Sequence, residues 1–89
     1  MVQRMVKRGR VKVDVRPGTF SSERCVSFFA GAQKYSLVVD ETMLEGDALL
    51  VQIVDEAAND VIIDLPSDTF ISGNRVRVPR DLVETVAEQ

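Results

Sequence analysis

Residues 47–65 have the sequence DALLVQIVDEAANDVIIDL and contain the densest apolar run in this 89-residue chain. Every position from 48 to 54 except Gln52 is apolar, so both faces of an extended segment would carry hydrophobic side chains. A short, continuous apolar run rich in β-branched residues is typical of a strand that is covered on both faces. The same density of valine and isoleucine disfavours the rival helical interpretation, because β-branched side chains lose χ1 freedom in a helix.

A second apolar run, residues 61–65, follows a polar segment at residues 55–60. The composition of this segment suits a turn, although it is long for a hairpin loop. We therefore predict that residues 47–65 form a central β-hairpin. Pro66 is expected to end the second arm, because proline cannot donate a hydrogen bond to a neighbouring strand.

Alternation of apolar and polar residues predicts further short strands on both sides of this hairpin. These segments are residues 10–16, 24–30, 35–39, 69–72 and 75–78. Turn residues separate several of them. Pro17-Gly18 favours a type II turn with the glycine at positive φ, and Gly73-Asn74 favours a two-residue hairpin turn.

Two segments have helical character. Residues 40–46 predict one helical turn, with Asp40 capping its start and Gly46 taking the left-handed conformation at its end. Residues 79–88 predict a short C-terminal helix, because apolar residues recur there at helical spacing. The apolar stripe of this helix would consist of Leu82, Val83 and Val86.

Together these elements predict an all-β fold: a small antiparallel barrel or roll (SH3-like or OB-like) of six or seven short strands with a short C-terminal helix. A chain of this length buries roughly 60–65% of its extended surface, which allows one modest core. We expect a single small β domain over residues 10–89, preceded by a basic N-terminal arm over residues 1–9. The predicted core consists of Val11, Val13, Val15, Phe28, Leu37, Val39, Leu49, Val51, Ile53, Ile63, Phe70, Val76, Val78 and Leu82.

The composition, 45% hydrophobic and 28% charged, is ordinary for a soluble globular protein. A net charge of −3 provides no global attraction to nucleic acid or to an anionic membrane. The single cysteine, Cys25, has no partner for an internal disulfide, and no apolar run approaches the ~20 residues of a membrane helix. No signal peptide is evident, so we expect a cytoplasmic protein with no membrane partner.

The chain lacks histidine, which removes the commonest general base and the commonest metal ligand. One cysteine is too few for a zinc site, and no glycine-rich phosphate loop is present. We interpret Cys25 as an inert strand residue, and the acids Asp55, Glu56 and Asp60 as a solvated hairpin tip rather than a Ca²⁺ site. The sequence thus predicts a protein that is not an enzyme and that binds no cofactor and no metal.

Charge is distributed unevenly along the chain. Six of the eleven basic residues lie within the first sixteen positions, and three more follow near the C-terminal end. Residues 35–74 contain no basic residue and nine acidic ones. The chain is therefore divided into basic ends and an acidic middle.

The outward faces of the first and last predicted strands are both basic. If these strands pair in a barrel, one surface would carry Arg10, Lys12, Arg16, Arg75 and Arg77. The N-terminal arm would add Arg4, Lys7 and Arg8 beside it. Such a surface would suit phosphate groups. The alternative interpretation is that these residues are solvated strand faces paired with Asp14, Asp64 or neighbouring acids.

Segregated charge without catalytic chemistry favours a non-enzymatic interaction module that binds protein. In one version the partner is a second copy, with the basic arm of one chain on the acidic residues 40–68 of the other. The alternative function is a nucleic-acid-binding module that uses the basic strand face.

Overall fold

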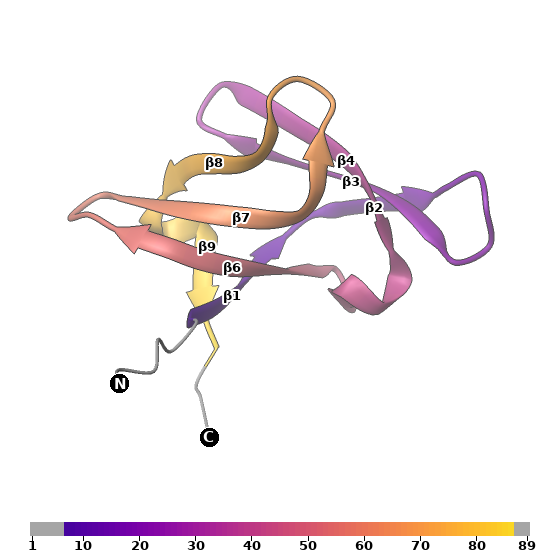
Figure 1. Ribbon diagram of the computed structural model, residues 1–89, viewed down its shortest axis with the longest axis horizontal. Helices are drawn as coiled ribbons and strands as arrows, with labels where there is room; N and C mark the ends of the chain where they lie inside the picture. The colour runs from indigo at the N-terminus through magenta and orange to yellow at the C-terminus, as the bar shows by residue number, and fades with distance from the viewer. Residues whose placement is uncertain (1–6, 87–89) are drawn as a thin grey trace, which may run out of the picture.

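The computed structural model describes residues 7–86, which form a curled antiparallel half-barrel without an α-helix (Figure 1). Its strands are β1 (Lys7–Lys12), β2 (Asp14–Pro17), β3 (Glu23–Ala30), β4 (Gln33–Asp40), β5 (Leu44–Glu45), β6 (Ala48–Glu56), β7 (Asp60–Thr69), β8 (Gly73–Pro79) and β9 (Val83–Thr85). Two 3₁₀ turns are present, η1 (Glu41–Met43) and η2 (Arg80–Leu82). The prediction of an all-β fold is therefore confirmed.

The strand β7 organises the sheet, because it pairs with three neighbours. The main path runs β2-β3-β4-β7-β6-β1-β9, while β5 pairs with β6 and β8 pairs with β7. The predicted central hairpin is β6 and β7, with Ile53 opposite Ile63 and a bulge between Ile53 and Asp55. In Figure 1, β7 bends sharply and leaves β6 to reach β4. This one strand therefore joins the two parts of the half-barrel, which are β2, β3 and β4 on one side and β6, β1 and β9 on the other.

The core lies on the concave side of the sheet and draws side chains from both parts. Its buried members are Val11, Val13, Val26, Phe28, Leu37, Val39, Leu49, Val51, Ile53, Val61, Ile63, Leu65, Val76 and Val78. Val15 and Leu82 are half-buried against this cluster. The placement of Phe70 in the core is wrong, since its side chain is 69% exposed.

Phe70 is exposed because β7 ends at Thr69 and the turn begins at Phe70, three residues earlier than the predicted turn at Gly73-Asn74. Thr69 takes the inward position, and its hydroxyl donates to Gly73 O at 2.8 Å and accepts from Ser72 N at 3.0 Å. A buried hydroxyl with two partners carries no unpaired polar atom into the core. The turn is therefore residues 70–72, and Gly73-Asn74 lies inside β8 rather than forming the predicted turn.

The predicted C-terminal helix is wrong. After the 3₁₀ turn η2, the chain extends as β9 and pairs with β1, with Val83 opposite Val11 and Thr85 opposite Gly9. The edge of β1 supplies the backbone hydrogen bonds that a helix would otherwise make internally. Gly9 permits this approach, because a Cβ atom there would lie 2.6 Å from Val83 Cγ1.

Residues 7–9 of the expected N-terminal arm belong to β1, so the sheet begins at Lys7. The remainder of that arm lies outside the described residues. Within residues 7–86 no helix has the length and apolar content required to cross a membrane.

The predicted turn at residues 40–46 is confirmed at its start, but η1 ends at Met43, so Gly46 lies between β5 and β6 and does not end the helical turn as predicted. The Asp40 carboxylate accepts from Thr42 N at 2.9 Å, and Gly46 has a φ of 64°. The predicted positive φ at Gly18 is wrong. Gly18 is required for a different reason, because a Cβ atom there would lie 2.7–2.9 Å from atoms of Glu23, two of them backbone atoms.

Candidate functional site

An open groove forms where β6 and β7 separate. Their last register pair joins Gln52 to Asp64, and two steps further the ladder would place Pro66 opposite Leu50. Proline has no N–H to donate, so the ladder does not continue through this position. The register between β7 and β8 also shifts in this region, between Asp64 and Thr69. The prediction that Pro66 ends the second arm is thus corrected: β7 continues, but its pairing with β6 stops.

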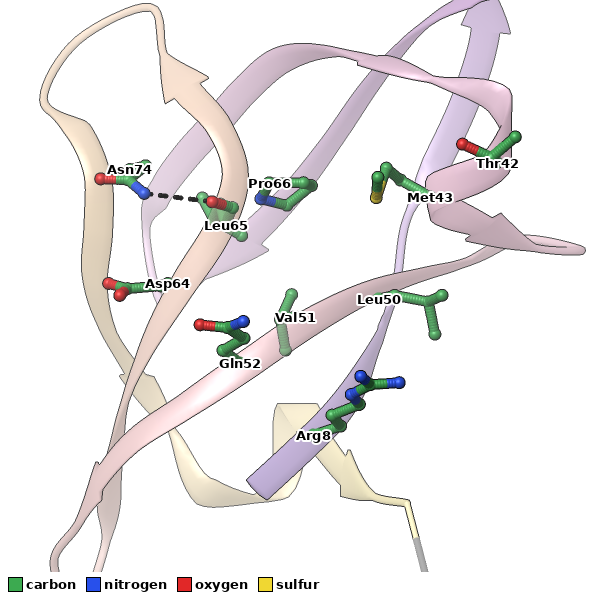
Figure 2. A pocket seen from close by; sticks show the side chains of 10 residues that line it. All are labelled: Arg8, Thr42, Met43, Leu50, Val51, Gln52, Asp64, Leu65, Pro66 and Asn74. Atoms are coloured by element: carbon green, nitrogen blue, oxygen red, sulfur yellow. Dashed lines mark hydrogen bonds between the residues drawn. The ribbon is translucent and has the colours of Figure 1, made fainter. Parts of the chain in front are cut away.

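The groove encloses about 690 Å³ and lies between β6, β7 and the 3₁₀ turn η1 (Figure 2). Its deepest residues are Val51 and Leu65, which belong to the core. The apolar parts of its walls are Leu50, Met43 and Pro66. A volume of this size falls in the range of about 300–1,000 Å³ that is usual for ligand pockets.

Polar side chains form the rim of the groove. The rim consists of Arg8, Thr42, Gln52, Asp64 and Asn74. Three of them lie in one row across the sheet, since Arg8 pairs with Gln52 and Gln52 pairs with Asp64. The next residue in this row is Arg75, opposite Asp64 on β8. Directly opposed residues of antiparallel strands share a face, so the row presents these side chains on the same surface.

The negative charge of Asp64, the acidic residue of this row, is neutralised by Arg75. Arg75 donates from Nε and Nη2 to the two carboxylate oxygens of Asp64, at 2.8 and 3.0 Å. These hydrogen bonds, together with the charge of Arg75, hold the pKa of Asp64 below its ordinary value. In Figure 2 the Asn74 amide donates to Leu65 O, at 3.2 Å, which ties β8 to the wall of the groove.

Arg8 differs from the other cations of β1. Lys7 pairs with Glu56 at 2.6 Å, Arg10 contacts Glu45 at 2.8 Å, and Lys12 lies 3.8 Å from Asp47. No ion pair joins Arg8 to another residue within 7–86. Figure 2 shows its guanidinium directed towards the groove.

Most of the predicted basic face is paired within the chain. Arg10 also donates to Glu84 at 2.9 Å, Arg16 donates to Asp14 at 3.1 Å, and Arg77 lies 3.7 Å from Asp60. The strands β1 and β8 are separated by β6 and β7, so Arg10 and Lys12 are not on a strand adjacent to Arg75 and Arg77. Arg16 lies on β2, at the far end of the sheet, and Arg4 lies outside the described residues.

The acidic middle of the chain supplies the partners for these cations. Glu56 contacts both Lys7 and Arg80, and the hydrogen bond from Lys7 is the main reason that its pKa is lowered. Hence charges that are segregated along the sequence are interleaved in space. Among residues 7–86 no cluster of three or more acidic or cysteine side chains is arranged to hold a metal ion.

The groove was not predicted from the sequence, although one signal pointed to it. Pro66 follows a predicted strand and cannot donate a hydrogen bond to its neighbour, but the register that places it opposite Leu50 depends on the bulge between Ile53 and Asp55. The contribution of Met43 and Thr42 has no such local signal, because it depends on where η1 packs. Met43 is partly exposed and therefore offers apolar surface to the groove instead of lying in the core.

No family model, curated protein or solved structure matches this chain. Its function is therefore inferred from the geometry and charge of residues 7–86.

Proposed function

We propose that this protein is a non-enzymatic module that binds another protein, and that its groove receives an extended segment of the partner. One observation carries the proposal. Leu50 and Val51 on β6, and Pro66 on β7, border an open groove of about 690 Å³, and no register pair links the two strands there.

An extended partner segment matches these borders. Strand edges recognise such segments through main-chain hydrogen bonds, and pockets for alternate side chains add specificity. The β5–β6 pairs end at Leu49, and the β6–β7 pairs begin at Gln52. The side of β6 between them therefore has no strand partner among the described residues. The apolar surface of Leu50, Met43 and Pro66 would hold the side chains of the segment.

The absence of catalytic chemistry in the sequence supports a binding function rather than an enzymatic one. The chain has no histidine, and Cys25 lies on β3, which contributes nothing to the groove. A groove of apolar walls with a few polar side chains is suited to recognition. We accordingly expect no turnover, cofactor or metal at this site.

Nucleic-acid binding through the basic strand face remains the second proposal, with less support. Phosphate contacts require cations that are available to phosphate, whereas Arg10, Arg75 and Arg77 each contact a carboxylate. The same pairing weakens the version in which two copies associate through charge. Light scattering at low and high salt, and titration with single- and double-stranded probes, test these two alternatives.

The proposed function is tested by selecting random peptides that are displayed as internal loops, without a free chain end, on the purified protein. The test variant is Leu50→Asp, which places a charge in the groove, and the matched control is Val54→Asp on the same strand. Val54 is exposed and lies outside the groove. We expect selected peptides to bind the wild type and Val54→Asp but not Leu50→Asp. Equal binding to all three folded proteins would contradict the proposal.

A further inference from the structure

We infer that the groove binds the carboxyl terminus of a partner polypeptide: Arg8 binds the terminal carboxylate, and the apolar side chain of the last residue packs over Val51 and Leu65. This inference rests on the proposed function and names the chemical class of its ligand. It follows from three features of the groove, which are its charge, its apolar depth and its open strand edge.

The charge of the rim selects an anion. Asp64 is the acid of the rim, and both of its carboxylate oxygens accept hydrogen bonds from Arg75. The positive charge of Arg8 is not offset by an ion pair within residues 7–86. A guanidinium matches the two oxygens of a carboxylate with parallel hydrogen bonds.

The apolar depth of the groove distinguishes a carboxylate on an aliphatic chain from a phosphate. Phosphate sites gather several cations or backbone N–H groups around one anion, whereas Arg8 is the one arginine among the rim residues and has no ion pair within residues 7–86. Below the rim lie Val51 and Leu65, and Leu50 borders them. These side chains would remove an aliphatic residue from water, which stabilises binding in proportion to the apolar area buried.

The open strand edge favours a main-chain carboxylate. Arg8 lies on β1 directly opposite Gln52, so β6 separates its backbone from the edge of Leu50 and Val51 that faces β7 and has no strand partner within residues 7–86, and its side chain borders the groove. A peptide extended along Leu50 and Val51 would bring its own chain end towards Arg8. An internal aspartate or glutamate would carry its charge on a side chain, perpendicular to the extended backbone and away from the strand edge.

The test uses pools of acetylated peptides with random sequence and a final valine or leucine, prepared with either a free carboxylate or a carboxamide end. Binding is followed by amide chemical shifts of ¹⁵N-labelled protein at Leu50, Val51 and Gln52, and by the Arg8 Nε resonance. The variant is Arg8→Gln. The control is Lys12→Gln, on the same strand and face, whose ammonium lies near Asp47 and outside the groove.

We expect the free-carboxylate pool to shift these resonances. The carboxamide pool should bind about ten- to a hundredfold more weakly, because that factor corresponds to the usual free energy of a hydrogen bond to a charged group. Arg8→Gln should lose the same factor, and Lys12→Gln should lose none. Equal binding of the two pools, or no effect of Arg8→Gln, would overturn the inference while internal peptides still support the proposed function. Octanoate binding as tightly as the peptides would overturn it in favour of a free aliphatic carboxylate.

Discussion

Arg75 on β8 and Asp64 on β7 face each other across the ladder and share two hydrogen bonds, of 2.8 and 3.0 Å. The Asp64 side chain is only 22% exposed, whereas that of Arg75 is 63% exposed. The pair sits where β7 bends away from β6, so it stabilises the last regular part of this ladder and one side of the groove.

Stability should depend on pH through Asp64. Its pKa is below the ordinary value of 3.8, because Arg75 donates hydrogen bonds to the charged form. A lowered pKa in the folded protein contributes stability that is present above the unfolded pKa and lost as pH falls through the folded pKa. Asp64→Asn should therefore lower the free energy of unfolding at pH 7, and the difference from the wild type should shrink as pH falls below 3.8.

Urea denaturation at a series of pH values measures this effect. The matched control is Asp14→Asn, whose carboxylate accepts from Arg16 at an exposed position of β2. Exposed ion pairs contribute little, so the control should leave the free energy of unfolding nearly unchanged. A constant difference between Asp64→Asn and the wild type across this pH range would contradict the assignment.

The core and the β7–β8 turn should respond differently to truncation. Ile63 is fully buried at the centre of β7, so Ile63→Ala should cost about 2–5 kcal/mol through lost burial and the cavity left behind. Phe70 is 69% exposed, so Phe70→Ala should change stability by less than about 0.5 kcal/mol. Chemical denaturation of both variants measures this contrast. A large loss for Phe70→Ala would show that Phe70 belongs to the core after all.

Gly9 should be required for the docking of β9. A methyl group there would lie 2.6 Å from Val83 Cγ1 and 3.3 Å from Ile53 Cδ1. We expect Gly9→Ala to destabilise the protein by about 1–3 kcal/mol, the usual cost of overpacking. Hydrogen exchange should become faster at Val86, whose N–H donates to Arg8 O at 3.0 Å.

A second substitution separates this clash from other effects at Gly9. Val83→Ala removes the atom that the new methyl group would meet, so it should recover part of the loss when combined with Gly9→Ala. Strict additivity of the two changes in a double-mutant cycle would argue against a direct contact.

Gly18 and Gly31 should be required for different reasons. A Cβ atom at Gly18 would clash with the backbone of Glu23, whereas Gly31 has a φ of 64° with open space around it. Asparagine tolerates the left-handed region better than alanine does. Gly31→Asn should thus be milder than Gly31→Ala, while Gly18→Asn and Gly18→Ala should both be severe. Thermal unfolding of the four variants checks this pattern, and a mild Gly18→Ala would be inconsistent with it.

Several strands were predictable because side-chain alternation is a local property. Val11 and Val13 alternate with polar residues, and both are buried as predicted. The cap at Asp40 was equally local, since its partner Thr42 is two residues away. Such features need no knowledge of the remaining chain.

The C-terminal segment shows where local patterns are insufficient. Leu82, Val83 and Val86 have helical spacing, yet Val83 lies in β9 because the edge of β1 offers it a partner. The choice between helix and strand therefore depended on a segment more than seventy positions earlier in the chain. Val26, Val61 and Leu65 were omitted from the predicted core for a similar reason, since their burial depends on which strands cover them.

The sequence alone determined the all-β class, the central hairpin of β6 and β7, and the supply of acids and bases. The tertiary structure decided which charges meet, that β9 pairs with β1, and that a groove opens beside Pro66. The physical reason is the separation along the chain over which each interaction acts. Strand periodicity and turn chemistry act between neighbours in the chain, whereas an ion pair such as Lys7 with Glu56 forms only when the fold brings distant residues together.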